Sequence, residues 1–395
     1  MNHILNEKLI AYILKNYDGD INKNSISVKN IKRIYKIILN AYKETKKIKY
    51  SIETTPIHSK EDMIYPRSFE GKFLPKEIKE YIINNAIQYH EVSMTIGSRK
   101  TTFYFVDFEP SNKDDLHNSI FIMIMWIFIA NKYSIKACAE TVKVYIYLTP
   151  FEKKLPDSHT SIISPINVNT GYTKSCQPNG EIVLYRKEEW LKVFLHEAFH
   201  LFGLDFSNNP TTEYVDKLKT IFNIDCDFLL FEAYCEFWAR IFNIGFTSFM
   251  MCEKKQFDIF QKYTNVLLSF ERVYSISQFK KILDFMNLEY NYLYSKEPQK
   301  KQACKILYKE NTNVFAYYVL TSLLLNNVDK TIDFFEKNNY SLLRFHDDVE
   351  VINKFVDLID DIKDYKPVLD ILKVNPETND KMIKQTLRMT LFNNL

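Results

Sequence analysis

Three residues with the spacing of a metal-binding motif lie near the middle of the chain: His196, Glu197 and His200, in the order H-E-x-x-H. In a helix, the two imidazoles would lie about one turn apart on one face, which suits paired nitrogen ligands of a zinc ion. Glu197 follows the first histidine, where its carboxylate can reach a water on the metal without being a ligand. The pattern therefore predicts hydrolytic chemistry at a zinc centre.

The residues around the motif predict a helix with a buried back. At about 100° per residue, one face carries only apolar side chains, and the histidines point to the opposite side. These apolar residues are Leu191, Phe194, Leu195, Ala198 and Phe202. We therefore expect the histidines to face a cleft. The alternative is a core helix with two incidental histidines, but buried His and Glu side chains need partners, and a metal explains their spacing.

Residues 193–202 read Val-Phe-Leu-His-Glu-Ala-Phe-His-Leu-Phe. This stretch resembles the extended signature of the zincin metallopeptidases, with uncharged residues around H-E-x-x-H and an apolar residue closing it. The resemblance implies a Zn²⁺ cofactor and a protein or peptide substrate, and it is specific for the metal chemistry rather than for the sequence that is cleaved.

The third ligand separates two zincin branches. One branch continues as H-E-x-x-H-x-x-G-x-x-H or D, and Gly203 fits it, but the ligand position is Phe206 and Asp205 is one residue out of register. The other branch, the gluzincins, takes a Glu from a second helix, with an acidic residue four positions later that steadies a ligand histidine. Glu232 and Glu236 have that spacing.

The resemblance to gluzincins thus implies that His196, His200 and Glu232 bind the metal and that Glu236 supports a ligand histidine. The residues themselves leave the reverse roles of the two glutamates open, because both lie on one face of a helix over 228–244. That helix is otherwise almost wholly apolar, so two buried carboxylates there would cost several kcal/mol each unless a cation compensates them. Cys176 is an alternative ligand, upstream of the motif.

These residues predict a zinc metallopeptidase in which Glu197 is the general base for a zinc-activated water. A further donor for the oxyanion is expected; His117, His159 and Tyr214 are candidates, and the sequence selects none of them. Two alternatives stay open: a structural or scaffold protein that keeps a zinc site, and a zinc hydrolase that does not act on peptides.

The elements around the motif predict an α+β fold. Residues 76–245 carry the signals expected of a zincin-like catalytic domain. These are a helix over 76–90, a β-prone stretch at 101–108, a buried helix over 116–133, a half-buried strand at 142–149 and a strand at 181–185. The last strand either holds an extended substrate by main-chain pairing or lies inside the sheet. Residues 1–75 predict a helical region and a linker, and residues 246–395 a helical domain.

Composition limits the other function classes. The 52 basic residues nearly balance 49 acidic ones, which indicates no strong nucleic-acid partner and no anionic membrane surface. The apolar run at 120–130 is too short for a transmembrane helix, and residues 1–20 lack a signal-peptide core. The 6 cysteines form no C-x-x-C pair, so we expect reduced thiols and a cytoplasmic location.

A weaker resemblance extends over residues 180–190, 204–207 and 232–238, which look similar to metallopeptidases encoded by large DNA viruses. It implies a viral protein in the virion or the host cytoplasm that acts on viral or host proteins during assembly.

Overall fold

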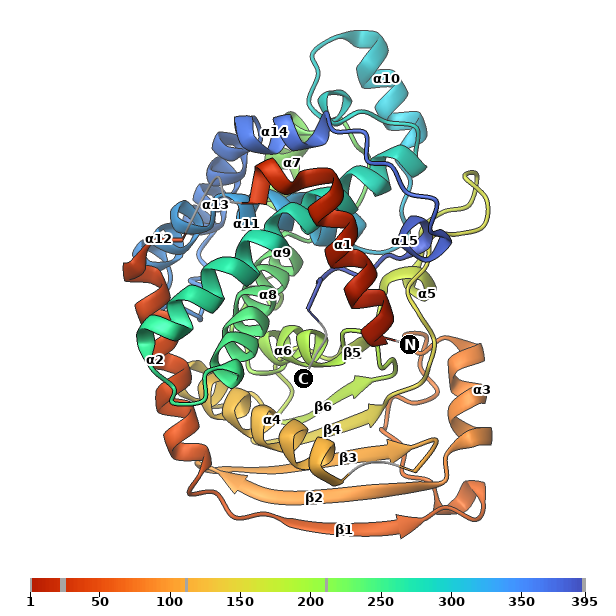
Figure 1. The fold of residues 1–395 in the computed structure, drawn as a ribbon, viewed down its shortest axis with the longest axis vertical. Coiled ribbons are helices and arrows are strands. Elements are labelled where there is room, and N and C mark those ends of the chain that lie inside the picture. Colours follow the sequence, from red (N-terminus) through yellow and green to blue (C-terminus); the bar gives the residue numbers. More distant parts are fainter. Residues whose placement is uncertain (1, 22–25, 111–112, 210–211, 393–395) are drawn as a thin grey trace.

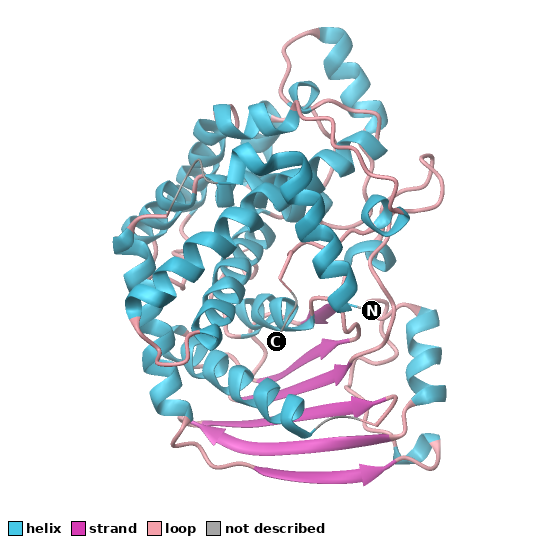
Figure 2. Ribbon diagram, in the orientation of Figure 1, coloured by secondary structure: helices cyan, strands magenta, loops and turns pink. Residues whose placement is uncertain are grey.

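The computed structural model describes residues 2–21, 26–110, 113–209 and 212–392. It has the α+β fold that the sequence predicts, with one six-stranded mixed sheet at one end of the molecule and most helices stacked on one side of it (Figures 1 and 2). The strand order is β1-β2-β3-β4-β6-β5. The strands are β1 (Ser51–Pro56), β2 (Gln88–Ile96), β3 (Arg99–Asp107), β4 (Thr141–Tyr147), β5 (Gly171–Thr173) and β6 (Asn179–Leu184).

The centre of the sheet is parallel and its margins are antiparallel. β3, β4 and β6 run parallel to one another, whereas β1, β2 and β3 form an antiparallel meander and β5 pairs antiparallel with β6. The predicted strands at 101–108 and 142–149 are confirmed as β3 and β4. The region predicted as a linker within residues 1–75 contains the extended strand β1, and the helix predicted over 76–90 ends at Asn85, before β2 begins.

Both faces of the sheet are covered. On one face, Val142, Val144 and Ile146 join the large core together with α4 (Lys113–Tyr133) and α6 (Trp190–Leu201). On the other face, Tyr145 and Tyr147 belong to a second, smaller apolar cluster with α3 (Lys76–Asn85) and side chains of residues 63–74. The prediction that residues 142–149 form a half-buried strand is therefore wrong, because a segment distant in sequence buries the second face.

Residues 2–221 contain the helices that cover the sheet and several others. They are α1 (Asn2–Ile21), α2 (Val28–Thr45), η1 (Lys60–Asp62), α3 (Lys76–Asn85), α4 (Lys113–Tyr133), α5 (Pro165–Val168), α6 (Trp190–Leu201) and α7 (Glu213–Ile221). The apolar run that the sequence assigned to a buried helix lies in α4, where residues 122–127 are at most 1% exposed. Among the helices of the described residues, none combines the length and the hydrophobicity that a membrane span requires.

The second half is helical, as predicted. Its elements are α8 (Leu230–Met251), α9 (Phe257–Phe285), η2 (Tyr290–Leu293), α10 (Pro298–Leu307), η3 (Phe315–Leu320), α11 (Thr321–Asn326), α12 (Val328–Asn338), α13 (Val349–Ile362), α14 (Lys366–Leu372) and α15 (Lys381–Gln385). Helix α8 passes through Gly245, where the sequence predicts its end. A Cβ at this glycine would lie 2.8 Å from Ile38 Cδ1, so the missing side chain lets α2 pack closely against α8.

Two cysteines that the sequence analysis treats as reduced thiols form a disulfide. Cys138 and Cys176 are bonded, whereas Cys226, Cys235, Cys252 and Cys304 are free. The bond joins the loop after α4 to the loop between β5 and β6. Cys176 also donates its backbone N–H to the carbonyl of His200, so the disulfide lies at the end of α6. The prediction of six reduced thiols is wrong for this pair, because spacing in sequence does not reveal which thiols meet in space.

Candidate metal centre

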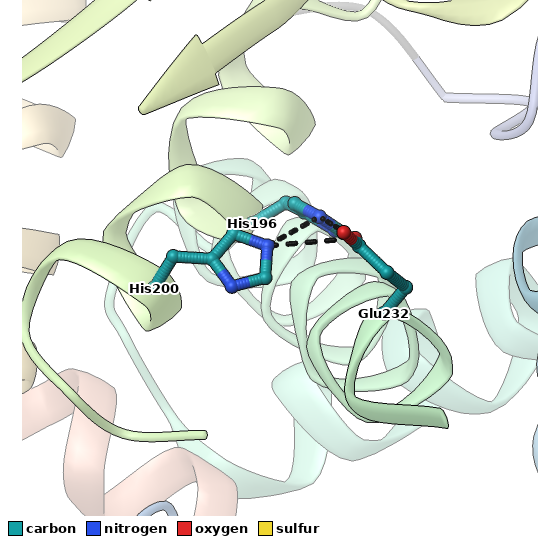
Figure 3. Close-up of side chains that lie close together, drawn as sticks. All are labelled: His196, His200 and Glu232. Carbon is teal, nitrogen blue, oxygen red and sulfur yellow. Dashed lines mark hydrogen bonds and ion pairs between the residues drawn. The ribbon is translucent and has the colours of Figure 1, made fainter. Parts of the chain in front are cut away.

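Two packed helices, α6 and α8, supply the candidate site. His196 and His200 lie on one side of α6, and Glu232 lies in the first turn of α8 and points at both of them (Figure 3). Gly203 has a φ of +61° just past the end of α6, the left-handed conformation of a helix-ending glycine. Its N–H is bonded to the carbonyl of His200, so this hydrogen bond closes the last turn of α6, in which His200 lies.

Three ligand atoms converge at the site. His196 Nε2 lies 3.0 Å from Glu232 Oε2, and His200 Nε2 lies 3.4 Å from the same oxygen. The two Nε2 atoms are 3.2 Å apart. A tetrahedral zinc ion bound at about 2.0–2.1 Å places its ligand atoms about 3.3 Å from one another. The two imidazoles and the carboxylate therefore fit a zinc ion in both donor type and spacing.

The other nitrogen of each imidazole contacts a second carboxylate. His196 Nδ1 is 3.2 Å from Glu236 Oε2, and His200 Nδ1 is bonded to Asp205 Oδ2. A carboxylate on Nδ1 holds the proton there and leaves Nε2 as the metal-facing atom, which is how supporting carboxylates orient ligand histidines. In this geometry the Glu232 carboxylate lies against the two Nε2 atoms. The carboxylates of Glu236 and Asp205 lie against the two Nδ1 atoms.

Buried charge surrounds these contacts. The Glu236 carboxylate also pairs with Lys192, at 2.9 Å, one turn before His196 on α6. Burial disfavours a charged carboxylate, but Lys192 and His196 together hold the pKa of Glu236 well below its ordinary value. Likewise, burial opposes ionisation of Glu232, and the two imidazoles still keep its pKa low. Each carboxylate is thus ionised because a cation lies against it.

The imidazoles show the complementary effect. Burial alone would lower the pKa of His200, but the thiol and carboxylates around it raise that pKa well above its ordinary value. The pKa of His196 is also raised, because its bonds to Glu232 and Glu236 outweigh burial. Without a metal, these histidines therefore tend to hold protons, which a metal ion would have to displace.

Glu197 is buried beside this cluster. Its residue is 8% exposed, and burial raises the pKa of its carboxyl, although the neighbouring imidazoles act in the opposite direction. A raised pKa makes the Glu197 carboxylate a stronger base, which suits a group that accepts and returns a proton.

The prediction that the histidines of α6 face a cleft is wrong, because α6 is buried along its whole length. His196 and His200 are 4% and 7% exposed, and Glu232 is 9% exposed. The side of α6 that carries the histidines is covered by α8 and by the aromatic ring of Tyr317. The centroid of that ring is 5.8 Å from the centroid of the His196 ring.

The other sequence candidates lie elsewhere or have partners. Cys176 is in the disulfide, so it is not a metal ligand. His117 contacts the Tyr50 hydroxyl, and His159 is bonded to the carbonyl of Phe285. Strand β6 pairs with β4 on one side and with β5 on the other, so it lies inside the sheet and does not offer an edge to a substrate.

The sequence analysis missed three residues of the site. Asp205 is out of register for a metal ligand, but its carboxylate is bonded to Nδ1 of His200. It also accepts a hydrogen bond from the Cys235 thiol at 3.4 Å, and His200, Asp205 and Cys235 form a second group with ligand atoms within 4.8 Å. Lys192 could have been found, because it precedes His196 by one helical turn on the histidine face. Tyr317 carries no local signal.

Comparison with protein-family models, with curated proteins and with solved structures finds no significant match to this chain.

Proposed function

We propose that this protein is a zinc-dependent metallopeptidase of the gluzincin type, with a zincin-like arrangement of α6, α8 and the sheet. The observation that carries the proposal is the spacing of three ligand atoms, His196 Nε2, His200 Nε2 and Glu232 Oε2, at 3.0–3.4 Å from one another. The ligand set leaves a fourth tetrahedral position for water, as in catalytic rather than closed structural zinc sites.

In this proposal the ion, when bound, supplies Lewis acidity that lowers the pKa of a water molecule and polarises a substrate carbonyl. The chain's own residues do the rest. Glu197 accepts a proton from the attacking water at its carboxylate and returns it to the departing amine. Glu236 and Asp205 keep the Nδ1 protons of the two ligand histidines in place, so that both Nε2 lone pairs stay directed at the ion.

Glu197→Gln tests the proposal. Glutamine keeps the size of the side chain but cannot take up the proton, so we expect the variant to retain zinc and to lose cleavage of a peptide library by at least about a hundredfold. The measurements are zinc content by elemental analysis and peptide cleavage by mass spectrometry. Glu232→Gln is the matched control, because it should lose zinc affinity as well as cleavage.

The low exposure of the site favours a second candidate, a zinc site that only stabilises the fold, since each of the four central residues is less than a tenth exposed. In that case zinc is present, wild-type protein cleaves nothing in the library, and Glu197→Gln has no effect beyond stability. A zinc hydrolase with another substrate would instead show zinc-dependent, Glu197-dependent turnover of small ester or amide substrates without peptide cleavage.

A further inference from the structure

A tyrosine from the C-terminal helical region reaches the candidate metal centre. The Tyr317 hydroxyl donates a hydrogen bond to Glu232 Oε2 at 3.1 Å. This is the same oxygen that lies against both Nε2 atoms. Asn313 donates its side-chain N–H to the Tyr317 hydroxyl at 3.3 Å, so the hydroxyl proton is directed toward the carboxylate.

An irregular turn places this tyrosine. Tyr317 lies in η3, a π-helical turn over Phe315–Leu320, and π turns are rare and are often found at functional sites. The start of the turn is held by Glu310, whose Oε2 accepts hydrogen bonds from the Phe315 N–H at 2.8 Å and from the Tyr308 hydroxyl at 2.7 Å. The turn that carries the hydroxyl is therefore held by contacts of residues 308–315 as well as by its packing against α8.

A carboxylate ligand has a freely rotating end, and a hydrogen bond to one of its oxygens limits that rotation. Glu232 is in the first turn of α8, and in the described structure Tyr317 is the neutral donor that it meets there. Groups that hydrogen-bond to metal ligands typically change metal affinity 10- to 100-fold when they are removed. The contact thus bears on how well Glu232 is preorganised as a ligand.

We propose that Tyr317 is a positioning residue for Glu232, and that the C-terminal helical region completes the metal centre through this hydroxyl. The inference rests on the proposed function, since it takes His196, His200 and Glu232 as the zinc ligands. It adds that residues 76–245 do not contain the whole site.

The chain offers a matched pair of variants, Tyr317→Phe and Tyr318→Phe. Both tyrosines lie in η3, and each variant removes a hydroxyl that donates one hydrogen bond; the Tyr317 hydroxyl also accepts one from Asn313. The Tyr318 hydroxyl bonds to the carbonyl of Leu387, whereas that of Tyr317 bonds to the proposed ligand. Tyr318 is also the more deeply buried of the two, so its variant should lose at least as much stability.

The experiment measures the zinc Kd of full-length wild type and of both variants by competition with a chromophoric chelator, together with the thermal unfolding of the metal-free proteins. We expect Tyr317→Phe to raise the zinc Kd about tenfold and Tyr318→Phe to leave it unchanged. The visible absorption of Co²⁺-loaded protein should also change in Tyr317→Phe only, because it reports the geometry of the ligands.

Two results would overturn the inference: an unchanged zinc Kd in Tyr317→Phe, or an equal increase in both variants, which would indicate a general loss of stability. Either result leaves the proposed function intact if wild type binds one zinc and needs Glu197 for cleavage. If wild type binds no zinc, the proposed function fails, and this inference fails with it. If zinc binds and nothing is cleaved, the positioning role still stands or falls on the Kd values.

Discussion

At the residue scale, carboxylates lie against both ring nitrogens of each candidate ligand histidine. The Nε2 atoms face each other and Glu232, and the Nδ1 atoms face Glu236 and Asp205. A histidine with neighbours at both ring nitrogens has one orientation, so little rearrangement is needed when a metal replaces the direct contacts. The same carboxylates compensate the cost of burying these imidazoles in a core of aromatic and aliphatic side chains.

The role of Asp205 can be tested with Asp205→Asn. The amide keeps the shape of the side chain but removes the negative charge from the partner of His200 Nδ1, so the zinc Kd should rise about 10- to 100-fold. The same chelator competition measures it. Asp284→Asn is the control, because Asp284 is an exposed carboxylate that pairs with Lys280 outside the candidate site. A zinc Kd equal to that of wild type would show that Asp205 does not support the ligand.

At the element scale, the site depends on how closely α6 approaches the sheet and α8. The last residue of α6, Leu201, lies over Gly180 at the start of β6. A Cβ at Gly180 would clash with Leu201 Cδ1. Glycine at this position therefore lets the helix that carries both histidines lie directly on the strand.

Gly180→Val is expected to destabilise the protein by about 1–3 kcal/mol, because the new side chain occupies the space of Leu201 in a packed core. Denaturant unfolding measures the change. The control, Ser51→Val on the exposed edge strand β1, should stay within about 0.5 kcal/mol of wild type. If Gly180→Val is as stable as wild type, α6 has room to move away from β6.

At the scale of the whole molecule, the C-terminal segment is bound at the start of α6. Residues 387–392 are buried, and the backbone N–H groups of residues 389–391 bond to buried carboxylates. Glu189, just before α6, accepts from Met389 at 2.7 Å and from Thr390 at 2.6 Å, and it pairs with Lys153 at 2.6 Å. Two segments distant in sequence are thus tied to the start of α6.

Glu189→Ala should cost about 3–5 kcal/mol of unfolding free energy, because it leaves the Lys153 ammonium buried without its carboxylate. The comparison is Glu80→Ala, which breaks a solvent-exposed pair with Lys76 and should cost less than about 1 kcal/mol. Both are measured by denaturant unfolding of the metal-free protein. Equal losses in the two variants would contradict the view that this buried pair holds the C-terminal segment in place.

Much of the fold could be predicted because its signals are local. The H-E-x-x-H spacing, the apolar run of α4 and the alternation in β4 each extend over only a few residues. Over that length, the period of the helix or strand decides which side chains share a face. β2 carried a similar signal, since His90, Val92, Met94 and Ile96 alternate with less buried residues, but the adjoining helical pattern concealed its start.

By itself, the sequence determined which side chains can lie on one face of α6 and of α8, and hence the pairing of His196 with His200 and the choice of Glu232 and Glu236 as candidates. Only the tertiary structure decided that Glu232 faces the Nε2 atoms, that Asp205 and Tyr317 join the site, and that Cys138 and Cys176 are bonded. The physical reason is that helical periodicity acts over a few residues, whereas these contacts join segments far apart in the chain and depend on how the whole core packs.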